Sequence, residues 1–194
     1  MFDVNDQIDV VDLTDVKKDN ILIPVNKNVK VRIVKTQGEK PRPNILSNAN
    51  AEKGKQADIK SLGLAFEIVD GIPVTNVETG EETMKFKGMK LSTGTMDLIV
   101  WADLNVANKK GVLRSDNNWW KNKQHLVGLK QFCQALGIPL AGLKVTDEFL
   151  SELIGKELLI DIGHEKETVE NPETGEYVPT GTLRNRITAY KKVS

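Results

Sequence analysis

Apolar and polar residues alternate along several short stretches of this chain, and the first clear stretch begins at Val29. Val29, Val31 and Ile33 fall on one face, and Lys30 and Arg32 fall on the other. A period of two residues is typical of a β-strand that buries one face. The pattern therefore predicts a first strand here, with its two cations exposed to solvent.

Four later stretches carry similar strand signals, and strands are predicted at residues 59–69, 84–91, 157–163 and 183–193. The second strand places Phe66 among inward apolar residues and ends at the turn dipeptide Asp70-Gly71. In the third strand, Gly88 is expected to form a bulge that re-aims the alternation. Trp101 lies in an apolar run that follows, and it is expected in the core.

The hydrophobic period becomes helical between the third and fourth strands. Apolar positions recur there at steps of three and four residues, at Leu126, Leu129, Cys133 and Leu136. This spacing predicts a helix that Gly137 ends, with Cys133 as a small buried apolar side chain. A shorter helix is expected to begin after the cap residue Thr146 and to end at Gly155.

The element order is three strands, a helical insert and two strands, with long loops predicted at residues 38–58 and 164–182. A five-stranded barrel with its helix between strands three and four is the OB-fold arrangement. We therefore expect a mainly β, OB-fold-like barrel, with helices between strands 3 and 4, as a single domain over residues 21–194. OB-folds bind oligonucleotides across strands two and three and at the loops that join strands one to two and four to five. The two long loops hold those positions here.

Residues 1–20 precede this domain as an acidic N-terminal arm. They hold six Asp against Lys17 and Lys18, for a net charge of −4. Their interspersed apolar residues fit either a mobile arm or a strand that caps a sheet edge. Beside plain solubilisation, two functions are considered for the arm: competition with DNA for a basic groove, and recruitment of phage replication or recombination proteins.

The chain as a whole is neutral, with 27 basic and 27 acidic residues, and neutrality by itself argues against a nucleic-acid-binding protein. The charges are segregated, however. Residues 21–60 carry nine Lys or Arg against three acids, residues 101–144 carry seven against two, and residues 145–194 carry six against ten. Local basic surface for a polyanion is therefore expected.

Several short strings resemble those of phage-encoded OB-fold single-stranded-DNA-binding proteins. They are Ile23-Pro24, Lys87-Gly88, Trp120-Lys121, LKQFCQALGI at residues 129–138, LIGKEL at residues 153–158 and Arg184-Asn185-Arg186-Ile187. The resemblance spans about residues 20–193, but it leaves the arm, the first long loop and residues 171–182 unmatched. It implies protection of single-stranded DNA during phage DNA replication or recombination, in the cytoplasm of a host cell.

Sequence-independent binding of a single strand requires cations along the phosphates and flat side chains on which bases stack. The predicted strand faces supply Lys30, Arg32, Lys85, Lys87, Lys90, Arg184, Arg186, Tyr190 and Lys192, and the two loops add Lys40, Arg42 and Tyr177. On the last strand, Leu183, Ile187 and Ala189 are expected to point inward between the site residues. Ordinary solvation explains any one of these cations, so the prediction rests on the set.

A second candidate is the run Trp119-Trp120-Lys121-Asn122-Lys123, in which adjacent indoles are followed by two lysines. Such a run can combine base stacking with phosphate contacts, so both tryptophans, Lys121 and Lys123 are predicted site residues. Neighbouring residues on a helix point about 100° apart, and at most one indole is therefore expected to lie fully in the core.

No catalytic residue, cofactor or metal site is predicted. Cys133 is the only cysteine, so an internal disulfide is excluded, and two histidines are too few to complete a structural zinc site with it. Asp161, Glu165 and Glu167 would suit a divalent-metal nuclease, but a solvated acidic loop explains them better. No stretch is long and apolar enough for a membrane-spanning helix.

The sequence thus predicts a binding protein for single-stranded DNA. Its first rival is an OB-like protein-protein interaction or adaptor module without nucleic-acid binding, which the zero net charge and the acidic C-terminal segment favour. The metal-dependent nuclease is the second rival.

Overall fold

A computed structural model of the chain describes residues 21–35, 43–47, 58–94, 96–107, 111–171 and 177–193. Within these ranges the protein is mainly β with a few short helices, as predicted. The acidic arm at residues 1–20 lies outside the described residues, and so do Lys40 and Arg42. No helix of the described part is both long enough and apolar enough to cross a membrane.

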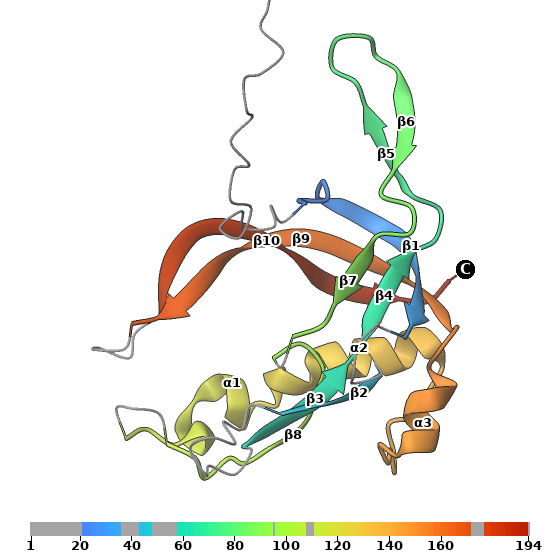
Figure 1. Cartoon of the computed structure of the whole chain (residues 1–194). Coiled ribbons are helices and arrows are strands. Elements are labelled where there is room, and N and C mark those ends of the chain that lie inside the picture. The colour runs from blue at the N-terminus through green and yellow to red at the C-terminus, as the bar shows by residue number, and fades with distance from the viewer. Residues whose placement is uncertain are drawn as a thin grey trace, which may run out of the picture.

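The largest sheet has five antiparallel strands in the spatial order β10-β9-β1-β4-β7 (Figure 1). Their bounds are β1 Asn26–Val34, β4 Ala65–Ile68, β7 Lys90–Ser92, β9 Glu157–Glu170 and β10 Tyr177–Lys191. The outermost strands are β7 and β10, and among the described residues no pairing between them closes a barrel. The sheet is therefore open, and the expected closure is absent there.

Two smaller sheets complete the β structure. One has the order β2-β3-β8, with β2 at Asn44–Ser47, β3 at Ile59–Gly63 and β8 at Ile99–Ala102. The other is the hairpin of β5, Ile72–Thr75, and β6, Glu82–Lys85, which projects away from the rest of the molecule in Figure 1.

The helices lie between β8 and β9, where a helical insert was predicted. They are the 3-10 helices Arg114–Asp116 and Gln124–Leu126 and the α-helices α1 Asn118–Lys121, α2 Val127–Leu136 and α3 Asp147–Glu152. Gly137 ends α2 in the left-handed conformation, at φ 69°, and the Thr146 hydroxyl caps α3 by accepting from the Phe149 amide. The predicted helix end at Gly137 and the predicted cap at Thr146 are both confirmed. Such signals can be recognised in a sequence because capping depends on local backbone geometry.

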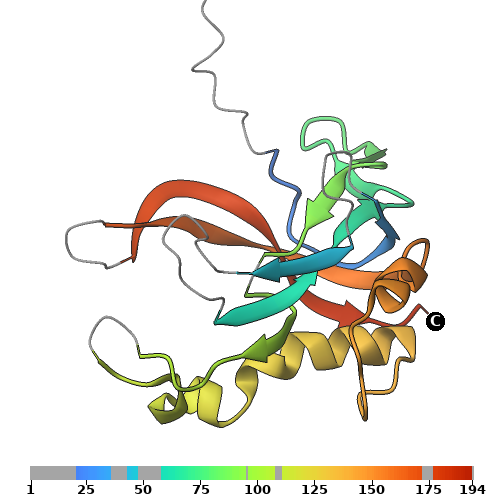
Figure 2. The same cartoon turned by 60° about the horizontal axis from the view of Figure 1, so that its bottom comes forward.

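The main core lies between the five-stranded sheet and α2, which runs beneath the strands in Figure 2. Val31 and Ile33 of β1 are fully buried, as their alternation predicts. Phe132 of α2 meets Tyr190 of β10 edge-on, with ring centroids 5.6 Å apart, and the Tyr190 ring also lies 6.1 Å from that of Phe66. These two aromatic contacts connect α2 to β10 and, through the Tyr190 ring, to β4.

The predicted second strand is two strands that belong to different sheets. β3 ends at Gly63 and β4 begins at Ala65, so the chain passes from the small sheet to the large one at Leu64. The Thr93 hydroxyl donates to the Leu62 carbonyl and accepts from the Leu64 amide, both at 2.9 Å. A buried side chain thereby satisfies the backbone groups that the bend removes from strand pairing.

The predicted third strand is also divided. β6 ends at Lys85, Phe86 and Gly88 adopt positive φ angles of 65° and 77°, and β7 begins at Lys90. A turn thus replaces the expected bulge. The prediction that one strand carries Lys85, Lys87 and Lys90 is wrong, because the turn puts Lys85 on the projecting hairpin and Lys90 on the large sheet.

The second predicted loop is largely a hairpin. β9 continues to Glu170 and β10 starts at Tyr177, so most of residues 164–182 are strand. The Thr180 hydroxyl donates to the Glu167 carbonyl across the hairpin, and cross-strand ion pairs add to the pairing. Within the first predicted loop, residues 44–47 form β2, while residues 38–42 and 48–57 lie outside the described ranges.

The segment before β1 is fixed to the far end of the sheet. The Asn185 side chain accepts from the Ile23 amide at 2.9 Å and donates to the Ile21 carbonyl at 2.8 Å. The His164 ring lies 2.7 Å from the Ile23 carbonyl, and the Ile23 side chain is fully buried. The first described residues of the chain therefore lie beside β9 and β10.

Candidate nucleic-acid interface

The predicted cations of β1 lie on the outer face of the five-stranded sheet and share one carboxylate. Lys30 Nζ is 2.9 Å from Glu157 Oε2, and Arg32 Nη2 is 2.7 Å from Glu157 Oε1. Hydrogen bonds from these two cations hold the pKa of Glu157 below its ordinary value, and the same carboxylate raises the pKa of Lys30. Lys30, Arg32 and Glu157 together therefore carry a net charge of one positive unit.

The predicted cations of β10 repeat this arrangement on the neighbouring hairpin. Arg184 Nη2 and Arg186 Nη1 bind the two oxygens of Glu165, at 2.6 and 2.9 Å. Asp161 accepts from Lys191 Nζ at 2.7 Å and from the Asn28 amide at 3.0 Å. The carboxylates that suggested an acidic loop or a metal site therefore lie on a strand, and cations neutralise two of them.

Of the other predicted cations on the strands, Lys87 and Lys90 lie near Arg32, whereas Lys85 and Lys192 lie elsewhere. Lys90 of β7 pairs in register with Glu67 of β4, which in turn pairs with Arg32, and Lys87 lines a shallow pocket with Arg32. Lys85 lies apart on the β5–β6 hairpin, and Lys192 is exposed just after β10. The backbone of Tyr177 begins β10, but its side chain is not among those described.

Tyr190 was predicted on the exposed face, and this is wrong. Its side chain is 7% exposed and lies in the core, because the register with β9 shifts between Ile187 and Ala189. The shift inserts one residue into β10 and inverts the alternation beyond it, so Tyr190 turns inward and Lys191 outward. Leu183 also departs from the prediction, since 37% of it is exposed.

The two adjacent tryptophans have different environments, as their helical spacing requires. Trp119 is 40% exposed, whereas Trp120 is 9% exposed and packs against Ile59 and Ile99. Lys121 and Lys123 are exposed beside them. Of these two tryptophans, only Trp119 can therefore offer a face to a base.

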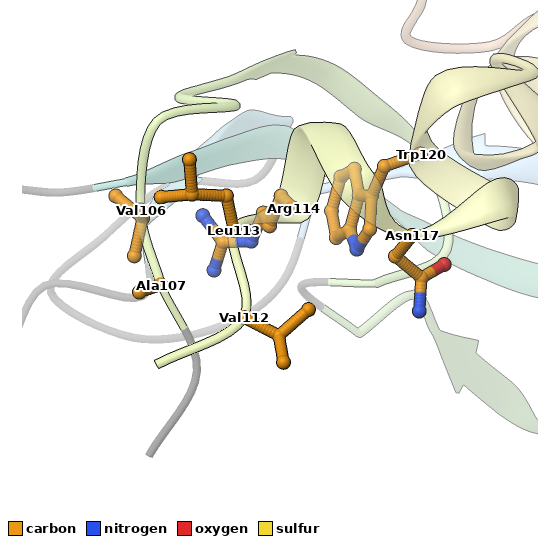
Figure 3. A pocket seen from close by; sticks show the side chains of 7 residues that line it. All are labelled: Val106, Ala107, Val112, Leu113, Arg114, Asn117 and Trp120. Carbon is orange, nitrogen blue, oxygen red and sulfur yellow. The ribbon is translucent and has the colours of Figure 1, made fainter. Parts of the chain in front are cut away.

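Trp120 instead belongs to the pocket of Figure 3. The Arg114 guanidinium lies 5.0 Å from the Trp120 ring centroid and forms an ion pair with Asp58 at 2.7 Å. Arg114 also donates to the carbonyls of Asp58 and Asp103. These contacts fasten the segment before α1 to the start of β3, so this pocket has a structural role.

The sequence interpretation missed Trp101, which was assigned to the core. Trp101 of β8 is 46% exposed, pairs in register with Lys60 of β3, and has Lys60 Nζ 5.5 Å from its ring centroid. An exposed indole beside an ammonium group is suited to a base and its phosphate. The exposure of Trp101 could have been inferred from the polar residue Lys60 in the neighbouring strand. Residues that pair across two strands lie on the same face of the sheet and therefore share the environment of that face.

A polar cleft of about 380 Å³ lies between β10 and the α1–α2 segment. Its walls include Asp97, Trp119, His125, Gln131, Arg186 and Tyr190. Three predicted site residues therefore come together here, although only two of them are exposed. Gly128 allows α2 to approach this wall, because a Cβ at that position would lie 2.5 Å from the Asp97 carbonyl oxygen.

An apolar groove occupies the other side of α2. Its lining residues include Val127, Leu129, Leu140 and Leu143, with Lys123 and Lys130 among the rest. Leu140 is 41% exposed and Val127 is 42% exposed. The groove thus shows apolar surface to solvent near two cations.

Comparison of the chain with protein-family models, with curated proteins and with solved structures gives no significant match.

Proposed function

We propose that this chain is a single-stranded-DNA-binding protein with an OB-type fold, which binds largely without regard to sequence and acts in phage DNA replication or recombination. The phage context rests on the short strings that resemble that family. The binding function rests on the fold and on the exposed side chains of two paired strands.

The strand order supports an OB-type sheet. If the five main strands are numbered along the chain, the order β10-β9-β1-β4-β7 is 5-4-1-2-3, with α2 between the third and fourth strands. An OB-fold is a partly open five-stranded Greek-key barrel, and it binds oligonucleotides across strands two and three. In this chain, β3 leads into the second main strand and β8 follows the third.

The pair of Lys60 and Trp101 is the observation that carries the proposal. The two residues face each other across β3 and β8, and each is exposed. Stacking of a base on an aromatic ring contributes ~1–3 kcal/mol and tolerates any base, while a neighbouring lysine can neutralise a phosphate. This combination fits a strand that is held without reading its sequence.

A protein-protein interaction module without nucleic-acid binding is the alternative. It is favoured by the sharing of Glu157 between Lys30 and Arg32, and of Glu165 between Arg184 and Arg186. Each carboxylate cancels half of the positive charge that a phosphate would otherwise meet. The two functions differ in whether the protein binds an oligonucleotide at low salt.

The test is the affinity of the full chain for a fluorescently labelled oligo-dT, measured by anisotropy at low and high salt. Trp101→Ala should weaken binding by the ~1–3 kcal/mol of one stacked base, and Trp101→Phe should keep most of the affinity. Lys60→Ala should reduce the slope of log K against log salt by about 0.7, the value for one phosphate contact on a single strand.

Lys156→Ala is the matched control, since this lysine is exposed at the turn between α3 and β9. It should leave both affinity and salt slope unchanged. If the wild-type chain binds no oligo-dT at low salt, the proposed function is wrong and the interaction module takes its place.

A further inference from the structure

We propose that the cleft between β10 and the α1–α2 segment receives one nucleobase of the bound strand, stacked on Trp119 and hydrogen-bonded to Tyr190 and His125. The inference rests on the proposed function and adds a base-reading position to an otherwise sequence-tolerant groove. Its starting point is a pair of buried polar atoms that lack partners.

Tyr190 Oη and His125 Nδ1 are buried atoms without a hydrogen-bond partner among the described residues. Both side chains line this one cleft, and they are 7% and 8% exposed. Leaving a buried polar group unsatisfied costs roughly 1–3 kcal/mol, so such groups are uncommon in folded proteins. Two of them in one cleft indicate that a ligand supplies the missing partners.

The two groups offer complementary chemistry. Burial lowers the pKa of His125 and so favours the neutral imidazole, whose Nδ1 can accept or donate one hydrogen bond according to the tautomer. Burial also raises the pKa of Tyr190, whose hydroxyl therefore stays protonated and can donate or accept. The amide of Gln131 adds a donor and an acceptor to the same wall.

The edge of a nucleobase carries such adjacent donors and acceptors, and its faces are flat and apolar. Trp119 is the exposed aromatic ring of the cleft, and the His125 ring centroid lies 5.7 Å from the Trp119 ring centroid. Arg186 lies on the β10 wall and is 53% exposed at its side chain, where a phosphate can reach it. The cleft volume of about 380 Å³ falls within the ~300–1,000 Å³ of small-molecule sites.

The deciding experiment compares the wild-type chain with Tyr190→Phe in binding to labelled oligo-dT, oligo-dC and oligo-dA of equal length. This substitution removes only the unpartnered hydroxyl and keeps the ring between Phe66 and Phe132. We expect the wild type to prefer one homopolymer. Tyr190→Phe should lower affinity for that homopolymer by roughly three- to tenfold, as for one lost hydrogen bond. The difference in affinity between the preferred homopolymer and the other two should therefore become smaller.

Ser61→Ala is the matched control. Ser61 Oγ is likewise buried without a partner among the described residues, but Ser61 lies on β3 and does not line the cleft. It should leave every affinity unchanged. Thermal unfolding of both variants should show no loss of stability, because neither deleted hydroxyl is bonded within the described protein.

The outcomes separate this inference from the proposed function. Binding of all three homopolymers with equal affinity by both the wild type and Tyr190→Phe would overturn the base-reading cleft and leave single-strand binding intact. Absence of any oligonucleotide binding by the wild type would overturn both. Binding of a free mononucleotide in the cleft, without any homopolymer preference, would likewise count against an occupant that belongs to the strand.

Discussion

The Thr93 hydroxyl accepts a hydrogen bond from the Leu64 amide at 2.9 Å, at the point where the chain leaves one sheet for another. The same hydroxyl donates to Leu62, and the Thr93 amide donates to the Leu64 carbonyl. A single buried residue just after the third main strand thus stabilises the bend in the second. β3, which lies before the bend, carries Lys60. β4, which lies after the bend, contributes buried side chains to the core.

Thr93→Val should therefore destabilise the fold while keeping the shape of the side chain. Loss of the hydroxyl leaves a buried amide and a buried carbonyl without that partner, which should cost about 1–3 kcal/mol of unfolding free energy in urea denaturation. Thr93→Ser keeps the hydroxyl and should lose much less. Equal stability of the Val variant and the wild type would show that the bend does not depend on this side chain.

Gly128→Ala tests the close approach of α2 to the chain at Asp97. Alanine favours a helix by about 1 kcal/mol over glycine, but its Cβ would lie 2.5 Å from a backbone oxygen. Overpacking of this kind typically costs about 1–3 kcal/mol, so we expect about 0–2 kcal/mol of net destabilisation by thermal or chemical unfolding. Gly94→Ala is the control, since its Cβ would meet only the Asp97 side chain at 3.4 Å. A more stable Gly128 variant would contradict the packing argument.

Glu157→Gln should release Lys30 and Arg32 from their shared carboxylate. If these cations face the bound strand, affinity for oligo-dT at low salt should rise, and the salt slope should steepen by about 0.7 for each additional phosphate that the released cations neutralise. Glu152→Gln, an equal change of charge at an exposed position of α3, is the control. A variant that binds no more tightly than this control would place the strand away from the outer face of β1.

Because of the ion pair between Asp161 and Lys191, the free energy of unfolding should decrease as the pH is lowered. Burial alone would raise the pKa of Asp161, but hydrogen bonds from Lys191 and the Asn28 amide outweigh it and lower the pKa. A carboxyl with a lowered folded pKa stabilises the protein above its unfolded pKa, and this stabilisation is lost as the pH falls through the folded value.

Denaturation midpoints measured from neutral pH to below the ordinary Asp pKa near 3.8 test this expectation. The wild type should lose stability more steeply than Asp161→Asn, which cannot titrate but can still accept hydrogen bonds. Glu152→Gln should follow the wild-type curve. Parallel curves for the wild type and Asp161→Asn would show that the pair contributes nothing to the acid response.

Local signals in the sequence predicted local structure well. The alternation from Val29 to Ile33, the end of α2 at Gly137 and the cap of α3 at Thr146 all depend on a few neighbouring residues, and the structure has them as predicted. The burial of Cys133 also follows from its place in the helical period. These features need no knowledge of distant partners.

The candidate site could be predicted only in part. Trp119 was expected to be a candidate for exposure, but Trp101 was assigned to the core because its own strand is apolar, and its exposure depends on where β8 lies against β3. Lys30 and Arg32 were recognised as outward-facing, yet their neutralisation by Glu157 depends on a strand more than a hundred residues away.

By itself, the sequence determined the type of most elements, their order and the face of β1 that is buried, since period and capping are properties of adjacent residues. Tertiary structure decided that the sheet stays open among the described residues, that the second strand is shared between two sheets, and that Tyr190 points inward. The last point has a definite physical reason: one extra residue in β10 shifts its register against β9 and exchanges the faces of Tyr190 and Lys191, which no alternation pattern within β10 alone can indicate.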